Sequence, residues 1–225
     1  MRFLIEQPGL DRADRIQLYV SYGLQLILLG TAVWALVEEN WLALFLSVMS
    51  LVLSFLPAFI RRSARVYLPI EIDLFTIVFV FASLYLGEIR AYYVRFWWWD
   101  LVLHTAAGFV MGMLGFILVY VLNREQRTKL TMTPFFTGLF SFAFAMTIGV
   151  LWEIFEYGMD VLFAMNMQKS GLPDTMGDLI VNTIGGAVVA VLGYFYVRGG
   201  DSLLFDRMVR RLLERNRWRS TSRPS

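Results

Sequence analysis

The sequence contains no cysteine and a single histidine, His104. Without cysteine, this chain has no disulfide, no thiolate nucleophile and no cysteine-ligated zinc site. Charged residues are scarce, at 17% of the chain against about 25% in ordinary soluble domains. Their formal net charge of +2 is too small to indicate binding to nucleic acid. No glycine-rich phosphate-binding loop is present, so any chemistry has to come from carboxylates, amides and one imidazole.

What the chain has in excess is apolar sequence. Hydrophobic residues make up 58% of it, and the mean hydropathy is +0.60. They gather in blocks close to the roughly 20 residues that a helix needs to cross a bilayer. This pattern predicts an all-α fold, a polytopic bundle of about six transmembrane helices. We expect these helices at residues 17–37, 41–60, 72–87, 98–122, 134–163 and 177–197.

The basic residues predict the orientation of the bundle. Seventeen of the 20 Lys and Arg residues fall at the N-terminus, in the second and fourth loops, or at the C-terminus. The other side has only Arg90, Arg95 and Lys169. Because Lys and Arg concentrate on the cytoplasmic side of membrane proteins, we expect both termini in the cytoplasm. The chain is thus expected in the cytoplasmic (inner) membrane, in contact with membrane lipids, and its first apolar block, which lacks a signal-peptide cleavage site, is expected to be a retained helix.

Two segments follow from this topology. Residues 1–198 are predicted to form the six-span transmembrane domain. Residues 199–225 are predicted to lie in the cytoplasm, as an amphipathic basic helix followed by a disordered tail. Between residues 202 and 218, apolar side chains repeat with helical spacing opposite a run of arginines, which is typical of a helix lying on an anionic membrane surface.

Ionisable and amide side chains stand out inside the last three predicted helices. Positions four apart lie on one helix face, so Asp100 should neighbour His104, and Asp178 should neighbour Asn182. With Asp174 placed just before its helix, all three helices carry such groups in the outer half of the membrane, where ionisable residues are costly and usually functional. The full set is Asp100 and His104, then Glu153, Glu156 and Asp160, then Asp174, Asp178 and Asn182.

The carboxylates in this set need positive charge or protons. Oxygen ligands with one imidazole suit a divalent metal ion, and Mg²⁺, Ca²⁺, Mn²⁺, Zn²⁺ and Fe²⁺ are all compatible. The set exceeds what one ion needs, so either two metal ions bind or some carboxyl groups stay protonated. Outer-loop cations, Arg90, Arg95 or Lys169, are the alternative source of positive charge. The candidate metal ligands are Asp100, His104, Asp160, Asp174, Asp178 and Asn182, and the candidate catalytic residues are Glu153 and Glu156.

Taken singly, these residues also have ordinary structural explanations. His104 alone is explained as a hydrogen-bonded packing residue. An aspartate at a helix start serves as an N-cap or is favoured by the helix dipole, which covers Asp174 and Asp178. Asn182 alone is explained as a polar contact between helices, and the spacing of Gly108 and Gly112 predicts close helix packing. The functional hypothesis therefore rests on the residues occurring together.

Three segments carry this set: "WWWDLVLHTAAGFVMG", "LWEIFEYGMD" and "PDTMGDLIVNTIGGAVVAVLGY". They resemble the YjdF-like family of bacterial and archaeal inner-membrane proteins. The order Asp-x-x-x-His, Glu-x-x-Glu and Asp-x-x-x-Asp-x-x-x-Asn-x-x-Gly is more distantly similar to the VanZ-like proteins, which are associated with resistance to a glycopeptide antibiotic. The VanZ-like pattern commonly has Glu-x-x-Gln where this chain has Glu153 and Glu156. The resemblance implies that the cluster matters and supplies no reaction.

Three functions are compatible with such a cluster. A membrane-embedded, metal-dependent hydrolase or transferase would act on a lipid-linked or envelope substrate, with Glu153 or Glu156 as general base. A cation transporter or channel would use the acids as an outer vestibule, although the inner half of the fifth helix offers mainly Thr137, Ser141 and Thr147. A non-catalytic envelope protein would use them as a structural ion site. The pattern favours the first, and whether the protein is an enzyme stays open at this point.

Overall fold

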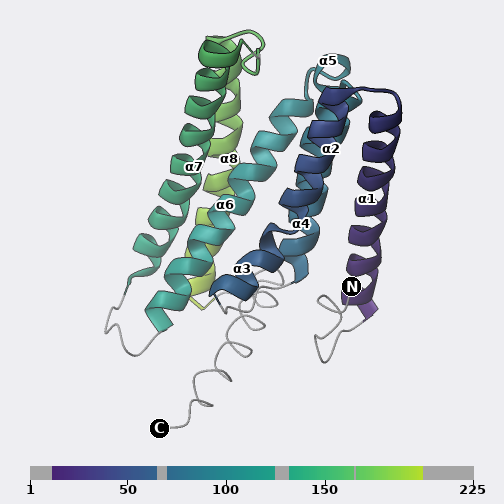
Figure 1. The fold of residues 1–225 in the computed structure, drawn as a ribbon. Helices are drawn as coiled ribbons and strands as arrows, with labels where there is room; N and C mark the ends of the chain where they lie inside the picture. The colour runs from purple at the N-terminus through teal and green to yellow at the C-terminus, as the bar shows by residue number, and fades with distance from the viewer. Residues whose placement is uncertain (1–11, 65–69, 125–131, 165, 200–225) are drawn as a thin grey trace. The chain divides into compact units, whose positions relative to one another are not determined.

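The structure is a computed structural model that describes residues 12–64, 70–124, 132–164 and 166–199 (Figure 1). Every regular element in those residues is helical. Six helical stretches among them are long and apolar enough to cross a membrane, which confirms the predicted all-α architecture. The predicted amphipathic helix and tail, from residue 200 onward, lie outside the described residues.

The chain divides into two units, one up to Trp97 and one from Trp98. The N-terminal unit begins with a hairpin of α1 and α2, joined at Asn40, whose side-chain oxygen accepts the backbone N–H of Ala43 and caps α2. The amide of Gln25 on α1 donates to the hydroxyl of Ser54 on α2. The elements of this unit are α1 (Arg12–Val37), α2 (Trp41–Ser54), α3 (Leu56–Ala64), α4 (Ile70–Val80), η2 (Phe81–Ile89) and α5 (Tyr92–Arg95).

Two predicted helices of this unit are interrupted. The span predicted at 41–60 breaks at Phe55 into α2 and α3, because Pro57 has no N–H to continue the ladder and the Ser54 hydroxyl bonds back to the carbonyl of Leu51. The span predicted at 72–87 continues from α4 into the π-helical segment η2. Each interrupted stretch is still long and apolar enough to cross a membrane.

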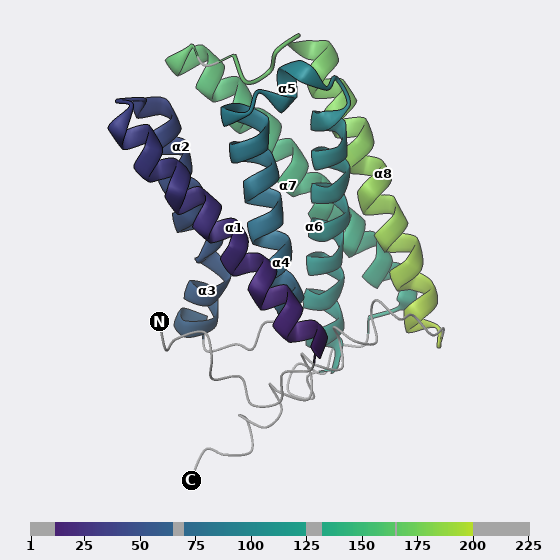
Figure 2. The same cartoon turned by 90° about the vertical axis from the view of Figure 1, so that its right-hand side faces the viewer.

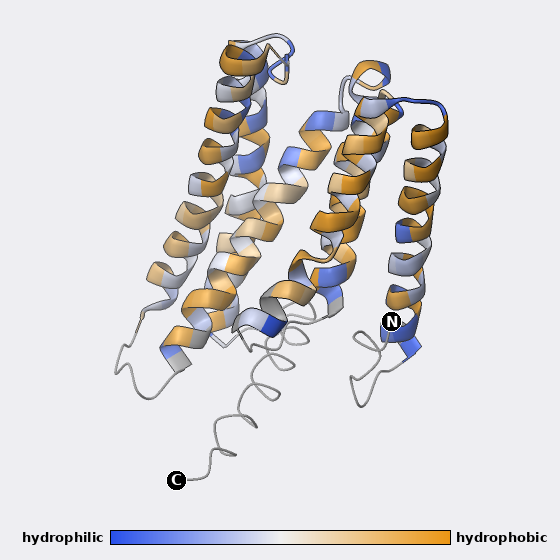
Figure 3. Cartoon of the chain, viewed as in Figure 1, coloured by the Kyte–Doolittle hydropathy of each residue, from blue (hydrophilic) through white to orange (hydrophobic). Residues whose placement is uncertain are grey.

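The C-terminal unit is a bundle of three long helices, and each contacts the other two (Figures 1 and 2). They are α6 (Trp99–Arg124), α7 (Pro134–Phe163) and α8 (Leu172–Val197). Thr133 caps α7 by accepting the N–H of Phe136, and Pro134 occupies its first turn, where a missing N–H costs nothing. Figure 3 shows hydrophilic turns near the start of α6 and of α8, at the top of the view.

The start of α8 differs from the prediction. The helix begins at Leu172 instead of residue 177, because Gly171 turns the chain with a positive φ of 69° and Pro173 fits the first helical turn. Asp174 therefore lies inside the first turn of α8 instead of just before the helix, and Gly171 occupies the N-cap position predicted for Asp174. The expectation for Asp174 as N-cap was wrong.

Glycines bring the backbones of α6 and α8 into direct contact. A Cβ atom added to Gly108 would lie 2.3 Å from the backbone oxygen of Asn182, and one added to Gly185 would lie 2.3 Å from the backbone oxygen of Thr105. On the α7 side, a Cβ at Gly149 would lie 2.4 Å from the side-chain nitrogen of Asn182. Only residues without a side chain permit such an approach, so these glycines fix how closely the three helices pack.

Candidate metal centre

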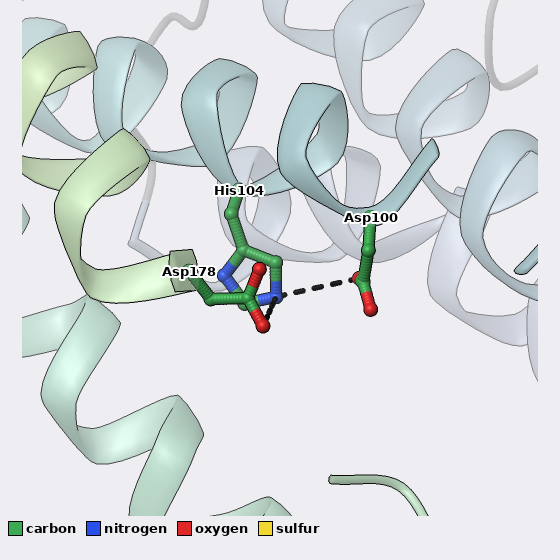
Figure 4. A group of neighbouring side chains, drawn as sticks. All are labelled: Asp100, His104 and Asp178. Atoms are coloured by element: carbon green, nitrogen blue, oxygen red, sulfur yellow. Dashed lines mark ion pairs between the residues drawn. The ribbon is translucent and has the colours of Figure 1, made fainter. Parts of the chain in front are cut away.

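His104 is the central residue of a polar cluster at the end of the C-terminal unit where α6 and α8 begin and α7 ends. Its Nε2 atom lies 3.6 Å from Oδ1 of Asp100, one turn earlier on α6, and 3.9 Å from Oδ2 of Asp178 on α8 (Figure 4). We call Asp100, His104 and Asp178 the first triad. Donor atoms of the three side chains all lie within 4.8 Å of one another, as a shared metal ion requires. The predicted pairing of Asp100 with His104 on one helix face is confirmed.

The other nitrogen of the same imidazole faces α7. Nδ1 of His104 lies 3.7 Å from Oε1 of Glu153, and Glu156 also brings an oxygen within 4.8 Å of the other two. We call His104, Glu153 and Glu156 the second triad. The two triads share one ring, so His104 links carboxylates from all three helices.

These carboxylates are buried and incompletely satisfied. Glu153 is 4% exposed and Asp178 is 2% exposed. Neither oxygen of Glu153, nor Oδ2 of Asp178, accepts a hydrogen bond from the residues that the structure describes, although Thr175 lies near enough to Glu153 to interact with it. Glu156 differs, because its Oε1 accepts the indole N–H of Trp152 at 2.9 Å. An ionised oxygen buried without a partner is strongly unfavourable, so a cation or a proton has to complete the cluster.

One positive charge does reach the cluster from the loop between α7 and α8. The ammonium of Lys169 binds Oδ2 of Asp100 at 2.5 Å. The alternative raised from the sequence, neutralisation by an outer-loop cation, therefore applies to this one carboxylate, whose Oδ1 still faces His104. Arg90 and Arg95 belong to the N-terminal unit, and a role for them stays a prediction.

Of the other three predicted ligands, two have contacts that explain them without a metal ion, and the third is partly exposed. Asp160 accepts the backbone N–H groups of Met167 and Gln168, and so holds the loop that follows α7. Asn182 donates to the backbone oxygen of Ala145 at 3.3 Å, an interhelical bond of the kind considered as its alternative role. Asp174 is partly exposed in the first turn of α8. Ligation by these three residues stays a prediction.

Below the cluster, three polar side chains of α7 are already engaged in hydrogen bonds. The hydroxyl of Ser141 donates to the backbone oxygen of Gly112 at 2.7 Å, which joins α7 to α6. Thr137 and Thr147 donate to carbonyls of their own helix, one turn earlier. The three polar residues that sequence reasoning offered as further stations for an ion are thus used in packing. The sequence named Lys169 as one of three candidate cations but did not identify Asp100 as its partner. The contact of Trp152 with Glu156 was missed, although its spacing of four residues is a helical one.

A family model described as "Predicted membrane protein (DUF2238)" matches residues 20–199. The chain belongs to this family. DUF2238 is the YjdF family, so the resemblance to YjdF-like proteins is confirmed, while the VanZ-like pattern stays a prediction. The matched range includes all residues of both triads, and it identifies the chain as a membrane protein without assigning it a reaction.

A curated relative and the solved structures add little beyond the family. An "Uncharacterized protein" of Thermotoga maritima is 29% identical over 117 residues, which cover 51% of this chain and 57% of that protein. The alignment thus spans less than two thirds of the relative's length. No solved structure gives a significant match. The function has to be argued from the site itself.

Proposed function

We propose that this DUF2238 protein binds a divalent metal ion at the first triad and uses it for hydrolysis or group transfer on a lipid-linked or envelope substrate. The observation that carries the proposal is the buried Oδ2 of Asp178, which faces Nε2 of His104 and accepts no hydrogen bond from the described residues. Metal–ligand bonds of about 2.0–2.1 Å place tetrahedral ligands roughly 3.3 Å apart. The two separations from Nε2 of His104, 3.6 and 3.9 Å, need only a small contraction to reach that geometry, and the oxygens of Asp100 and Asp178 start within 4.8 Å of each other.

The number of ligands supports a catalytic site over a purely structural one. Structural zinc sites usually have four protein ligands, whereas catalytic sites have three and leave a position for water or substrate. The first triad supplies three, and Asp100 keeps its side chain 18% exposed while that of Asp178 is 2% exposed. The site is therefore accessible from the side of Asp100. A metal ion bound there would polarise a substrate oxygen and lower the pKa of water.

The second triad supports the role of His104 as a metal ligand, because it places carboxylates at the other nitrogen of the imidazole ring. A metal-bound histidine usually donates its second N–H to a carboxylate, which fixes the ring and raises its basicity. Oε1 of Glu153 lies 3.7 Å from Nδ1 of His104 and would accept that N–H after a closer approach. Glu156, beside it on the same face of α7, is the second candidate for accepting a proton during the reaction.

The close packing of α6 against α8 does not favour the hypothesis of a cation transporter or channel. A transported ion needs further polar stations or a water-filled path, but α6 and α8 touch at Gly108 and Gly185 immediately beyond the triads. Deeper in the bundle, a Cβ at Gly193 would lie 2.5 Å from the ring of Phe116. The described part of this unit is tightly packed below the cluster, so we retain the enzymatic function as the proposal.

The distribution of Lys and Arg residues leads to a location and an orientation for the protein. We propose that the protein lies in the cytoplasmic membrane with both termini inside, so that the triads lie in the extracytoplasmic half of the bilayer. Reporter fusions at residues 1 and 225 are expected to give cytoplasmic signals, and a reporter in the loop between α7 and α8 the opposite signal. Extracytoplasmic signals from both termini would place the triads at the cytoplasmic surface and remove envelope substrates from consideration.

The reaction is tested with purified protein loaded with Mn²⁺ or Zn²⁺ and supplied with lipid-linked phosphate esters or amides. Glu153→Gln and Glu156→Gln, made separately, are expected to retain the metal ion, and at least one is expected to lower the turnover rate by about 10²–10⁴-fold, as loss of a general base does. Rates are compared with metal content measured on the same samples. Metal-loaded protein that neither binds nor turns over any such substrate would contradict the proposal.

A further inference from the structure

Lys169 occupies a defined position at the rim of the proposed metal centre. Its ammonium binds Oδ2 of Asp100, while Oδ1 of the same carboxylate faces Nε2 of His104 at 3.6 Å. The ammonium is thus separated from the proposed metal position by a single carboxylate group. Its side chain is 34% exposed and can therefore be reached by a ligand.

The loop that carries Lys169 is held to both neighbouring helices. The backbone N–H groups of Met167 and Gln168 donate to Asp160 on α7. The side-chain amide of Gln168 donates to the hydroxyl of Thr175 on α8 at 2.7 Å. Because these anchors are the two residues directly before Lys169, the lysine is placed by the fold and does not depend on its bond to Asp100 alone.

Lys169 also brings positive charge close to several carboxylates of the site. It is close enough to Asp174 and Asp178 for its charge to act on both. In the described part of the C-terminal unit, the other basic residues, Arg124 and Arg198, lie at the far ends of α6 and α8. A negatively charged substrate approaching the triads meets several carboxylates, and within the described part of this unit Lys169 adds to the positive charge of the proposed metal ion that offsets their repulsion.

We propose that Lys169 binds an anionic oxygen of the substrate next to the metal ion, and that the substrate class is a phosphate group. This inference rests on the proposed metal centre. An ammonium has three N–H donors and a full positive charge, so it can bind Asp100 and an anionic oxygen of a ligand together. A phosphate presents several equivalent oxygens, and it can place one on the metal ion and another on the lysine, the arrangement typical of phosphate sites.

The test uses the full-length protein in detergent, as wild type, Lys169→Gln, Lys169→Arg and a matched control, Arg198→Gln. The control removes the same charge at the other end of α8, where Arg198 contacts Tyr194. Metal content is measured first by elemental analysis. Binding of inorganic phosphate, and of phosphatidic acid in mixed micelles, is then measured by calorimetry on metal-loaded protein.

We expect Lys169→Gln to keep its metal ion and to lose phosphate affinity by about tenfold or more, as loss of a charged hydrogen bond does. Lys169→Arg should bind within a few-fold of wild type, and Arg198→Gln should match it. Tighter binding of phosphatidic acid would assign a lipid headgroup, and equal binding a soluble phosphate. Unchanged phosphate binding in metal-loaded Lys169→Gln, or no phosphate binding by metal-loaded wild type, overturns this inference alone. Wild-type protein without a metal ion overturns the proposed function as well.

Discussion

Asp178→Asn and His104→Ala are each expected to abolish the stoichiometric binding of a divalent metal ion by the purified protein. His104 provides the nitrogen ligand of the first triad, and Asp178 provides a buried oxygen for which the described residues offer no other partner. Loss of an outer-shell group already lowers metal affinity by roughly 10–100-fold, so loss of a direct ligand should exceed this range. Elemental analysis of protein purified in detergent measures the effect.

Thermal unfolding gives a second measure of the same variants. A metal ion at 100 times its dissociation constant should stabilise the wild type by about 2.7 kcal/mol, and this gain should vanish in both variants. In metal-free buffer, Asp178→Asn should be at least as stable as wild type, because a buried amide needs neither a cation nor a proton to be neutral. That comparison separates loss of a ligand from loss of the fold.

Asp160→Asn is the matched control for these variants. It changes a carboxylate in the same unit to an amide, but the oxygens of Asp160 hold the backbone of the following loop, so the metal content should stay at the wild-type level. Equal metal content in wild type, Asp178→Asn and His104→Ala would contradict the proposed centre. Loss of the metal ion in Asp160→Asn would instead indicate that Asp160 is a metal ligand, as the sequence predicts.

Gly185→Ala is expected to disrupt the packing of α6 against α8. Its new Cβ would lie 2.3 Å from the backbone oxygen of Thr105 and 2.8 Å from the backbone nitrogen of Phe109. Backbone atoms cannot rotate away as a flexible side chain can, so the two helices have to separate. Overpacking typically costs about 1–3 kcal/mol, and this clash should reach the upper part of that range. Thermal unfolding in detergent measures the loss, and metal affinity should fall with it, because His104 and Asp178 lie on the displaced helices.

Gly158→Ala is the matched control for this packing effect. Gly158 lies in α7, and a Cβ added there meets nothing within 4 Å. Alanine is the better helix former by up to about 1 kcal/mol, so this variant should be as stable as wild type or slightly more stable. If both alanine variants behaved alike, the close approach of α6 and α8 at Gly185 would be refuted.

Much of the fold could be predicted from the sequence, because long apolar blocks with capping residues define helices locally. Pro134 and the capping residue Thr133 predict the start of α7, and the observed helix has the predicted bounds, Pro134–Phe163. The errors lie where a local residue overrides the hydropathy pattern. Gly171 and Pro173 start α8 early, and Pro57 divides the second span although hydropathy continues through it.

The parts of the site that could be predicted are those in which helical periodicity brings side chains together on one helix face. A spacing of four placed Asp100 beside His104, and a spacing of three put Glu153 near Glu156 on α7. The sequence also grouped Asp160 with them, but this residue lies in the last turn of α7, where its oxygens accept backbone N–H groups of the following loop. The position of Lys169 depends on the path of that loop, which has no repeating pattern to read.

The contact between α6 and α8 at Gly108 and Gly185 has a consequence for turnover. Together with Asn182, whose amide bonds to Ala145 on α7, it closes the packed interior of α6, α7 and α8 beyond the triads. For the proposed enzyme, a substrate that reaches the metal ion past Asp100 therefore finds no route onward between these helices, and its product would leave toward the side from which the substrate came. Release of the product is then expected to limit the turnover rate.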